Sequence, residues 1–125
     1  VVFDVDDFKQ VNDQYGHVKG DICLAEIAAC IKKAYARHGY CYRMGGDEFC
    51  VLLRDGDKEH ACARDFVRRL SERRKELDFL PTVSFGSAEI SNENVVTVKD
   101  RADHNMYRYK KERKAHRMSG DAGEE

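Results

Sequence analysis

The sequence has no apolar run approaching the roughly 20 residues that a transmembrane helix needs, and no excess of charge of either sign. Its 22 Lys and Arg residues face 23 Asp and Glu residues, so the formal net charge is -1. A balanced chain of this kind provides no general basic field for nucleic acid. We therefore expect a domain that neither contacts a membrane nor binds nucleic acid.

The five cysteines lack the spacing of a disulfide framework or a metal site. Their number is odd, and no interval between Cys23, Cys30, Cys41, Cys50 and Cys62 gives a Cys-x-x-Cys pair or a zinc spacing. Free thiols are typical of a reducing compartment. The predicted location of the domain is the cytoplasm, even where the full-length protein is tethered to a membrane.

Apolar residues are plentiful enough for one core. Of the 125 residues, 42% are hydrophobic, and a chain of this length buries roughly two-thirds of its unfolded surface on folding. The chain starts at Val1, inside an apolar run and without Met, so we expect a piece of a longer protein. Residues 118–125 have the composition of a disordered tail.

Local patterns indicate the first three elements. Residues 1–5 are β-branched and aromatic and favour a buried strand. The acidic segment that follows becomes helix-like and stops at Gly16. From Asp21 to about His38, apolar residues recur at i, i+3, i+4 and i+7, which predicts a second helix with Gly39 as its stop.

The middle of the chain indicates a hairpin and a helix. Residues 40–44 and 47–53 are strand-like, and Gly45-Gly46 between them predicts a tight turn whose residues need a positive φ. An amphipathic helix is expected over residues 58–77. The residues expected to point inward from this helix are Ala61, Phe66, Val67 and Leu70.

The last third completes an alternating pattern. Residues 82–90 favour a strand, residues 91–96 a loop, and about Val98 to Lys114 a last helix. The order is therefore strand, helix, helix, strand, strand, helix, strand, helix. We predict an α+β, ferredoxin-like sandwich in which helices cover a mostly antiparallel sheet.

Two acidic clusters lie at predicted strand ends. Strand alternation puts Asp4 and Asp6 of the first cluster, which also contains Asp7, on one side. Asp4 closes an apolar stretch, where an unpaired carboxylate is costly and needs a cation. Neighbouring strands could bring Asp47, which precedes Glu48 in the hairpin, next to Asp4 as oxygen ligands for Mg²⁺ and nucleotide phosphates. The alternative is that these carboxylates only form turns and solvate the sheet edge.

Polar side chains follow the first cluster at short intervals, at Lys9, Asn12, His17 and Asp21. An amide at Asn12 and a carboxylate at Asp21 can together read a guanine edge, because adenine would leave the carboxylate unpaired. This pairing favours GTP over ATP. Alternatively, Asn12 ends a short helix and Asp21 caps the next one.

The end of the last helix is mostly basic, and its cations could hold a triphosphate. The helix dipole favours the same charges there, so a solvated basic helix end is the alternative. The basic residues are Arg108, Lys110, Lys111, Arg113, Lys114 and Arg117.

Four ordered motifs together resemble one known family. They are RMGGDEF at Arg43 to Phe49, FDVDDFKQVNDQYGHVKGD at Phe3 to Asp21, VSFG at Val83 to Gly86 and AD..MYRYK at Ala102 to Lys110. The set resembles the GGDEF family of diguanylate cyclases over residues 1 to about 114. The resemblance implies a nucleotide-cyclase palm fold and an enzyme that condenses two GTP into cyclic di-GMP with release of two pyrophosphates.

Residue roles follow by position from this resemblance. It implies a site for Mg²⁺ or Mn²⁺ formed by the carboxylates of Asp4 and Asp47 and the carbonyl of Val5. Asp47 also resembles the proton acceptor for the 3′-hydroxyl, and Glu48 belongs to the same catalytic motif. Lys9 resembles the residue that stabilises the phosphate side. The implied substrate-binding residues are Asn12 and Asp21 for guanine, His17, Gly45 and Gly46, and Lys110 and Lys114 for phosphates.

The chain departs from the family pattern at three places. The DxLTGLxNR-like segment that normally precedes the first strand is not in the chain, so we assign residues 1–117 to an N-terminally truncated GGDEF domain. Residues 36–39 read ARHG in place of the RxxD of feedback inhibition, so product inhibition through that site is not expected. Arg113-Lys114-Ala115 stands where the family has a GRN-like triplet, which leaves the second phosphate contact to Lys114 or Arg113.

Partners also follow from the implied reaction. Two GTP must react with each other symmetrically, so catalysis needs a homodimer that presents one GTP from each domain. Sensor or receiver domains are expected elsewhere in the full-length chain. The alternative function is a catalytically silent GTP-binding or dimerisation module that regulates a larger signalling protein.

Overall fold

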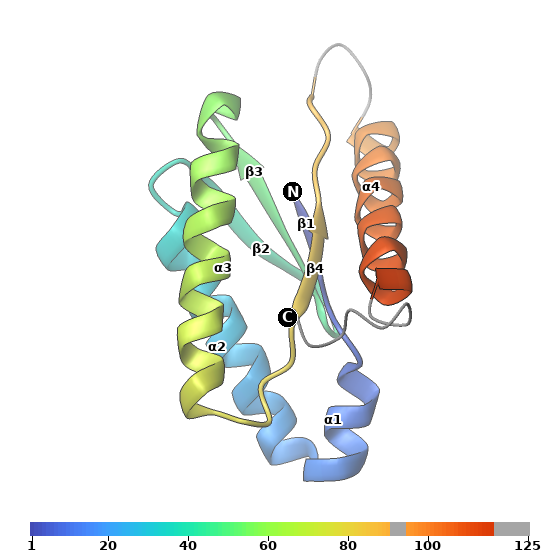
Figure 1. Ribbon diagram of the computed structural model, residues 1–125. Coiled ribbons are helices and arrows are strands. Elements are labelled where there is room, and N and C mark those ends of the chain that lie inside the picture. The colour runs from blue at the N-terminus through green and yellow to red at the C-terminus, as the bar shows by residue number, and fades with distance from the viewer. Residues whose placement is uncertain (91–94, 117–125) are drawn as a thin grey trace.

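The computed structural model describes residues 1–90 and 95–116, so the predicted tail at residues 118–125 and most of the predicted loop lie outside the described part. The elements follow the predicted order (Figure 1). They are β1 (Val2–Val5), α1 (Phe8–Tyr15), α2 (His17–Tyr35), β2 (Gly39–Gly45), β3 (Glu48–Leu53), a 3₁₀ turn (Gly56–Lys58), α3 (Glu59–Glu76), β4 (Val83–Gly86) and α4 (Val95–His116).

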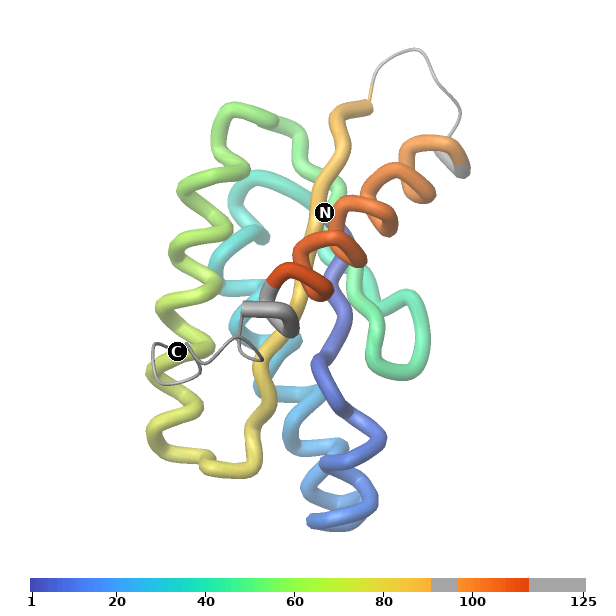
Figure 2. Tube along the Cα trace, turned by 45° about the vertical axis from the view of Figure 1, so that its right-hand side comes forward, coloured from blue at the N-terminus to red at the C-terminus, as the bar shows by residue number. Residues whose placement is uncertain are grey.

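The four strands form one antiparallel sheet in the order β2-β3-β1-β4. Helices α2 and α3 pack on one face of this sheet, and α4 crosses the other face (Figure 1 and Figure 2). The predicted α+β sandwich with an antiparallel sheet is therefore confirmed. Within residues 1–90 and 95–116, no helix combines the length and the apolar character that a membrane crossing requires.

Strand β1 divides its side chains between the two faces, as the two-residue period of a strand requires. Phe3 is fully buried, and the centre of its ring lies 5.4 Å from that of Tyr35 and 5.2 Å from that of Phe66. Val2 packs on the opposite face, against α4. Asp4 is therefore presented from an inner strand that is paired on both sides.

Helix α2 begins earlier than the sequence predicts. It starts at His17, directly after Gly16, whose φ is 90°. Asp21 is the fifth residue of the helix, so the alternative in which Asp21 caps it is wrong. Gly39 does not stop α2 but belongs to β2, where a Cβ would lie 2.5 Å from the carbonyl oxygen of Leu52. The glycine at position 39 therefore permits the close approach of β2 and β3.

The buried face of α3 differs in part from the prediction. Phe66 and Leu70 are buried as predicted, but Ala61 is exposed and Val67 is 50% exposed. The third buried residue is Cys62, which gives a stripe with i, i+4, i+8 spacing. Ala61 and Val67 each stand one residue off this stripe, and one residue turns a helix by about 100°. That rotation carries both side chains toward solvent.

Helix α4 approaches β4 backbone to backbone. A Cβ on Gly86 would lie 2.7 Å from the Cα of Met106, so a glycine is needed at this contact. Ala102 and Met106 are buried here together with Val2 of β1. The contact sets the height of α4 above the sheet. Lys110, one turn beyond Met106, then contacts Asp4 at the end of β1.

Candidate active site

The turn between β2 and β3 carries the first candidate residue. Gly45 has a φ of 141° and Gly46 a φ of 49°, so both glycines adopt the positive φ that the sequence predicts. Gly45 still pairs with Glu48, and the turn consists of Gly46 and Asp47, one residue later than predicted. Asp47 therefore stands, half-buried, at the tip of a tight turn.

Arg43 holds this turn in place. Its Nε and Nη2 atoms both donate to the carbonyl oxygen of Gly46, at 3.1 and 2.7 Å. Strand pairing is irregular between Arg43 and Gly45, which is typical of a β-bulge. The guanidinium thus fixes the peptide group that directly precedes Asp47.

Replacing Arg43 with Lys is expected to loosen the turn without unfolding the sheet. Lysine keeps the charge but cannot donate two bonds from one planar fork. Loss of about 1 kcal/mol of hydrogen bonding corresponds to about fivefold faster hydrogen exchange at the amides of residues 46–48. The matched control is Arg54→Lys, because Arg54 donates a single bond to the carbonyl of Arg37. Equal exchange at residues 46–48 in both variants would contradict the prediction.

The turn docks onto β1 next to Asp4. The amide of Val5 donates to the carbonyl oxygen of Asp47 at 3.1 Å. Asp4 lies directly opposite Glu48 in the register of β1 and β3. The two acidic clusters therefore meet at one end of the sheet, as their positions on neighbouring strands indicate.

Lys110 of α4 supplies the cation beside Asp4. Its Nζ lies 3.0 Å from Oδ2 of Asp4 and 3.9 Å from Oδ1 of Asp6, so both carboxylates are on the same side of β1 as predicted. Burial alone would lower the pKa of Lys110, but the hydrogen bond to Asp4 and the charges of both carboxylates raise that pKa above its usual value. Lys110 is thus held in its charged form over the end of β1.

Asp6 is the buried member of the first cluster. It is 6% exposed, and its carboxylate accepts hydrogen bonds from the hydroxyls of Thr82 at 2.7 Å and Ser84 at 2.6 Å. Asp7 is exposed and adopts a φ of 53° where the chain turns into α1. Asp4, whose side chain is 24% exposed, thus pairs with Lys110 beside a fixed Asp6.

Two residues of α4 that sequence reasoning missed complete the surroundings of Glu48. The Nζ of Lys99 lies 3.5 Å from Oε1 of Glu48 and 2.7 Å from Oδ2 of Asp103. The hydrogen bond to Asp103 raises the pKa of Lys99. The i, i+4 spacing of Lys99 and Asp103 signals an ion pair on one helix face, but it does not reveal which strand that face meets.

The side chain of Asn12 on α1 packs against Gly20 of α2, the residue that precedes Asp21. Gly20 is buried in α2, and a Cβ there would collide with Oδ1 of Asn12 and lie 3.1 Å from its Cγ. The half-buried amide of Asn12 therefore rests on α2 one residue from the exposed Asp21. Within the described part of the chain, neither side chain makes a hydrogen bond or an ion pair.

The remaining candidates are not drawn into these two groups. Lys9 on α1 and His17 at the start of α2 are exposed, and neither shows a hydrogen bond or ion pair with the described residues. Lys114 belongs to α4, but its side chain lies outside the described part. The structure thus assembles a carboxylate and lysine group at β1 and β3, and it packs the Asn12 amide of α1 against Gly20 of α2, next to Asp21 in the chain.

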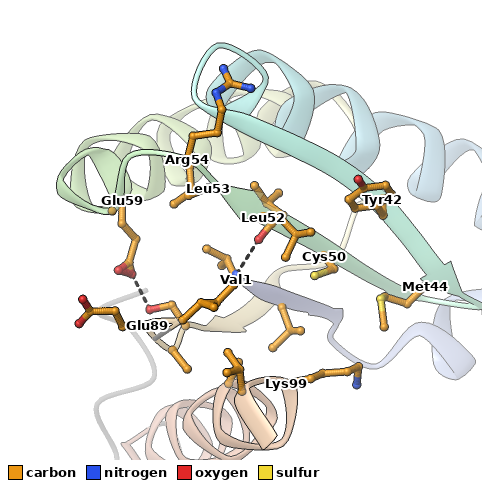
Figure 3. A pocket seen from close by; sticks show the side chains of 18 of the residues that line it. Val1, Tyr42, Met44, Cys50, Leu52, Leu53, Arg54, Glu59, Glu89 and Lys99 are labelled. Atoms are coloured by element: carbon orange, nitrogen blue, oxygen red, sulfur yellow. Dashed lines mark hydrogen bonds between the residues drawn. The ribbon is translucent and has the colours of Figure 1, made fainter. Parts of the chain in front are cut away.

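Cavity size does not pick out this site. A cavity of about 750 Å³ opens on the α4 face of the sheet and is lined by Val1, Tyr42, Met44 and Leu52 among others (Figure 3). None of the site residues predicted from the sequence lines it, although Lys99 does. A groove of about 610 Å³ between α2 and the hairpin does include Asp21. The polar groups, and not the volumes, therefore identify the candidate site.

The donors at β1 and β3 suit a small divalent cation. Asp4 and Asp47 offer carboxylates and Val5 a backbone carbonyl, and ligands of oxygen alone are those that Mg²⁺ and Mn²⁺ prefer. In residues 1–90 and 95–116, no group of three His, Cys, Asp or Glu side chains is arranged to hold a metal ion unaided. An ion at this place would take its remaining ligands from water and phosphates.

Comparison with known sequences agrees with this geometry. The family model described as diguanylate cyclase, GGDEF domain, matches residues 1–116. The chain is 34% identical over 113 residues to diguanylate cyclase DgcM of Escherichia coli strain K12, an alignment that covers 88% of this chain and 28% of DgcM. The chain spans less than a third of the length of the curated relatives it matches.

Solved structures show the same fold. The active GGEEF domain of a diguanylate cyclase from Vibrio cholerae matches with a TM-score of 0.75 at 28% identity, over 89% of this chain and 74% of that one. The GGDEF domain of DgcB from Caulobacter crescentus, solved in complex with c-di-GMP, matches with a TM-score of 0.75 at 28% identity, over 88% and 70%. The predicted palm fold is therefore confirmed.

Proposed function

Because the chain belongs to the GGDEF family of diguanylate cyclase domains, we propose that it condenses two molecules of GTP into cyclic di-GMP with release of two pyrophosphates. The observation that carries this proposal is the meeting of Asp4 and Asp47 beside Lys110. Two carboxylates and one ammonium at the end of a rigid sheet offer ligands for a divalent cation and a partner for phosphate. A relative from Caulobacter crescentus binds the proposed product.

The carboxylates of Asp4 and Asp47 and the carbonyl of Val5 would hold Mg²⁺ or Mn²⁺. When bound, the ion neutralises charge on the transferring phosphoryl group and the leaving pyrophosphate. Lys9 and Lys110 stabilise the phosphates from the two sides of the site. Since Lys110 is a fixed cation, its charge requires no rearrangement of protons when phosphate arrives.

Guanine recognition belongs to the second group of side chains. The amide of Asn12 donates to O6 or N7, and the carboxylate of Asp21 accepts from N1–H and the exocyclic amine. Adenine would leave Asp21 unpaired, which favours GTP. His17 and the backbone of Gly45 and Gly46 provide further contacts, and Lys114 a second phosphate contact.

The chemistry requires two copies of the chain. The 3′-oxygen of one GTP forms a bond to the α-phosphorus of the other, and the bond from that phosphorus to pyrophosphate breaks. The hydroxyl proton passes to Asp47, with Glu48 beside it. A C2 pair of domains, each holding one GTP, performs this step twice, so we propose a homodimer that is at least transient. We further propose that sensor or receiver domains elsewhere in the full-length protein control this pairing, in the cytoplasm.

The direct test is to incubate the purified chain at high concentration with GTP and Mg²⁺ and to separate the nucleotides by chromatography. We expect a product that co-elutes with cyclic di-GMP and two pyrophosphates for each molecule formed. ATP in place of GTP should give no cyclic product. Tight binding of GTP without any product would leave two explanations, a GTP-binding regulatory module or a fragment that needs the rest of its protein. The same assay on the full-length protein separates the two, and no product there would refute the cyclase.

A further inference from the structure

We propose that Gly20 determines nucleotide selectivity by holding the amide of Asn12 in place, an inference that rests on the proposed role of Asn12 in binding guanine. Gly20 has no side chain with which to contact a base. It acts as a positioning residue, at the point where α1 lies against the first turns of α2 (Figure 1).

The backbone does not need a glycine at this position. Gly20 lies inside α2 without the positive φ of Gly16, and its amide donates to the carbonyl of Gly16 at 3.1 Å as in a regular helix. Glycine in a helix interior costs stability relative to alanine. The feature that does require it is the space that a Cβ would fill, which the Asn12 amide occupies.

Two residues of α1 share this space. Phe8 and Asn12 are four residues apart and therefore lie on one face of α1. The ring of Phe8 packs against the main core, and its Cζ would lie 3.5 Å from a Cβ on Gly20, an ordinary contact. Phe8 would therefore tolerate a Cβ at position 20, whereas the amide of Asn12 would not.

Alanine at position 20 would displace the amide and leave the helix in place. The atom in its way is Oδ1 of Asn12, the end of a short side chain that can rotate about χ1. Any other rotamer moves the amide away from Gly20, the residue that precedes Asp21. The chain would remain folded but would present the base with a carboxylate alone.

The test uses four variants, Gly20→Ala, Asn12→Ala, the double variant and Asp21→Asn, with Gly56→Ala as the matched control. Gly56 lies in the 3₁₀ turn, where a Cβ would meet nothing within 4 Å. Binding of the 3′-deoxy forms of GTP, ITP and ATP is measured by titration calorimetry with Mg²⁺. These analogues lack the attacking hydroxyl and therefore bind without reacting.

The inference predicts a specific pattern of affinities. GTP and ITP carry O6 where ATP carries an amino group, so loss of the Asn12 bond to O6 in Gly20→Ala should weaken both about equally and lower the preference for GTP over ATP about tenfold, as expected for one lost hydrogen bond and its unpaired partner. Asp21→Asn should instead reduce the preference of GTP over ITP. The double variant should be no worse than Asn12→Ala, because both changes remove the same contact. The side-chain amide resonance of Asn12 should shift in Gly20→Ala, with a melting temperature within a few degrees of the parent.

Two results would overturn the inference. If Asn12→Ala loses the preference for GTP while Gly20→Ala keeps it, Gly20 has no positioning role and the proposed base contact stands. If Asn12→Ala also keeps the preference, the base contact itself is wrong, and the inference fails with it. Cyclic di-GMP formation is measured separately, so neither result decides the proposed reaction.

Discussion

Replacing Asp47 with Ala is expected to lower the rate of cyclic di-GMP formation at least about a hundredfold. A positioned proton acceptor typically contributes about 10²–10⁴ to a rate, and the same side chain is a proposed ligand of the divalent cation. The rate is measured at saturating GTP with the purified chain. The fold should be unaffected, because the Asp47 side chain makes no hydrogen bond or ion pair within the described residues.

The control for this variant is Asp57→Ala. Asp57 is an exposed carboxylate in the 3₁₀ turn that follows β3, whereas Asp47 precedes that strand, so the loss of Asp57 should leave the rate at the parent value. The two variants carry the same change in net charge. A rate for Asp47→Ala within a few-fold of Asp57→Ala would exclude Asp47 from the chemistry.

Phe3→Ala should have the largest effect on stability. Phe3 is fully buried, and its ring centre lies 5.4 Å from that of Tyr35, 5.2 Å from that of Phe66 and 5.6 Å from that of Phe85. Removing such a ring leaves a cavity and typically costs about 3–5 kcal/mol of the free energy of unfolding. Small domains have only about 5–15 kcal/mol in total, so a large fraction of the stability is lost. Urea denaturation followed by circular dichroism measures the difference.

Val67→Ala provides the comparison on α3. The sequence pattern puts Val67 in the core, whereas the structure leaves it 50% exposed, so this change should alter the free energy of unfolding by no more than about 0.5 kcal/mol. Similar losses for Phe3→Ala and Val67→Ala would show that α3 is rotated relative to the described packing.

The sequence predicts the elements of this fold well where a residue pattern is compatible with only one kind of element. Strand β1 follows from β-branched and aromatic residues, and the hairpin from a double glycine between two apolar runs. Glycine alone is ambiguous, because it can stop a helix, start one or permit close packing. Gly16 starts α2 at once, and Gly39 admits a neighbouring strand, which is why both predicted ends of α2 are displaced.

The candidate site, too, is predictable from the sequence only in part. Strand neighbours bring Asp4 and Asp47 together, and that follows from topology alone. The contacts of Lys99 and Lys110 depend on the height and angle of α4 above the sheet, which the contact of Gly86 with Met106 sets. No local pattern encodes that angle, so the contacts of Lys99 and Lys110 with the strand carboxylates are visible only in three dimensions, although the family motif already points to Lys110.

The ion pair between Lys110 and Asp4 gives this carboxylate a counter-ion from within the chain. Under the proposed function, Asp4 would hold the divalent cation and Lys110 would contact the phosphates of GTP, so each charge would exchange one partner of opposite charge for another. Such an exchange spares the end of the sheet an unpaired carboxylate.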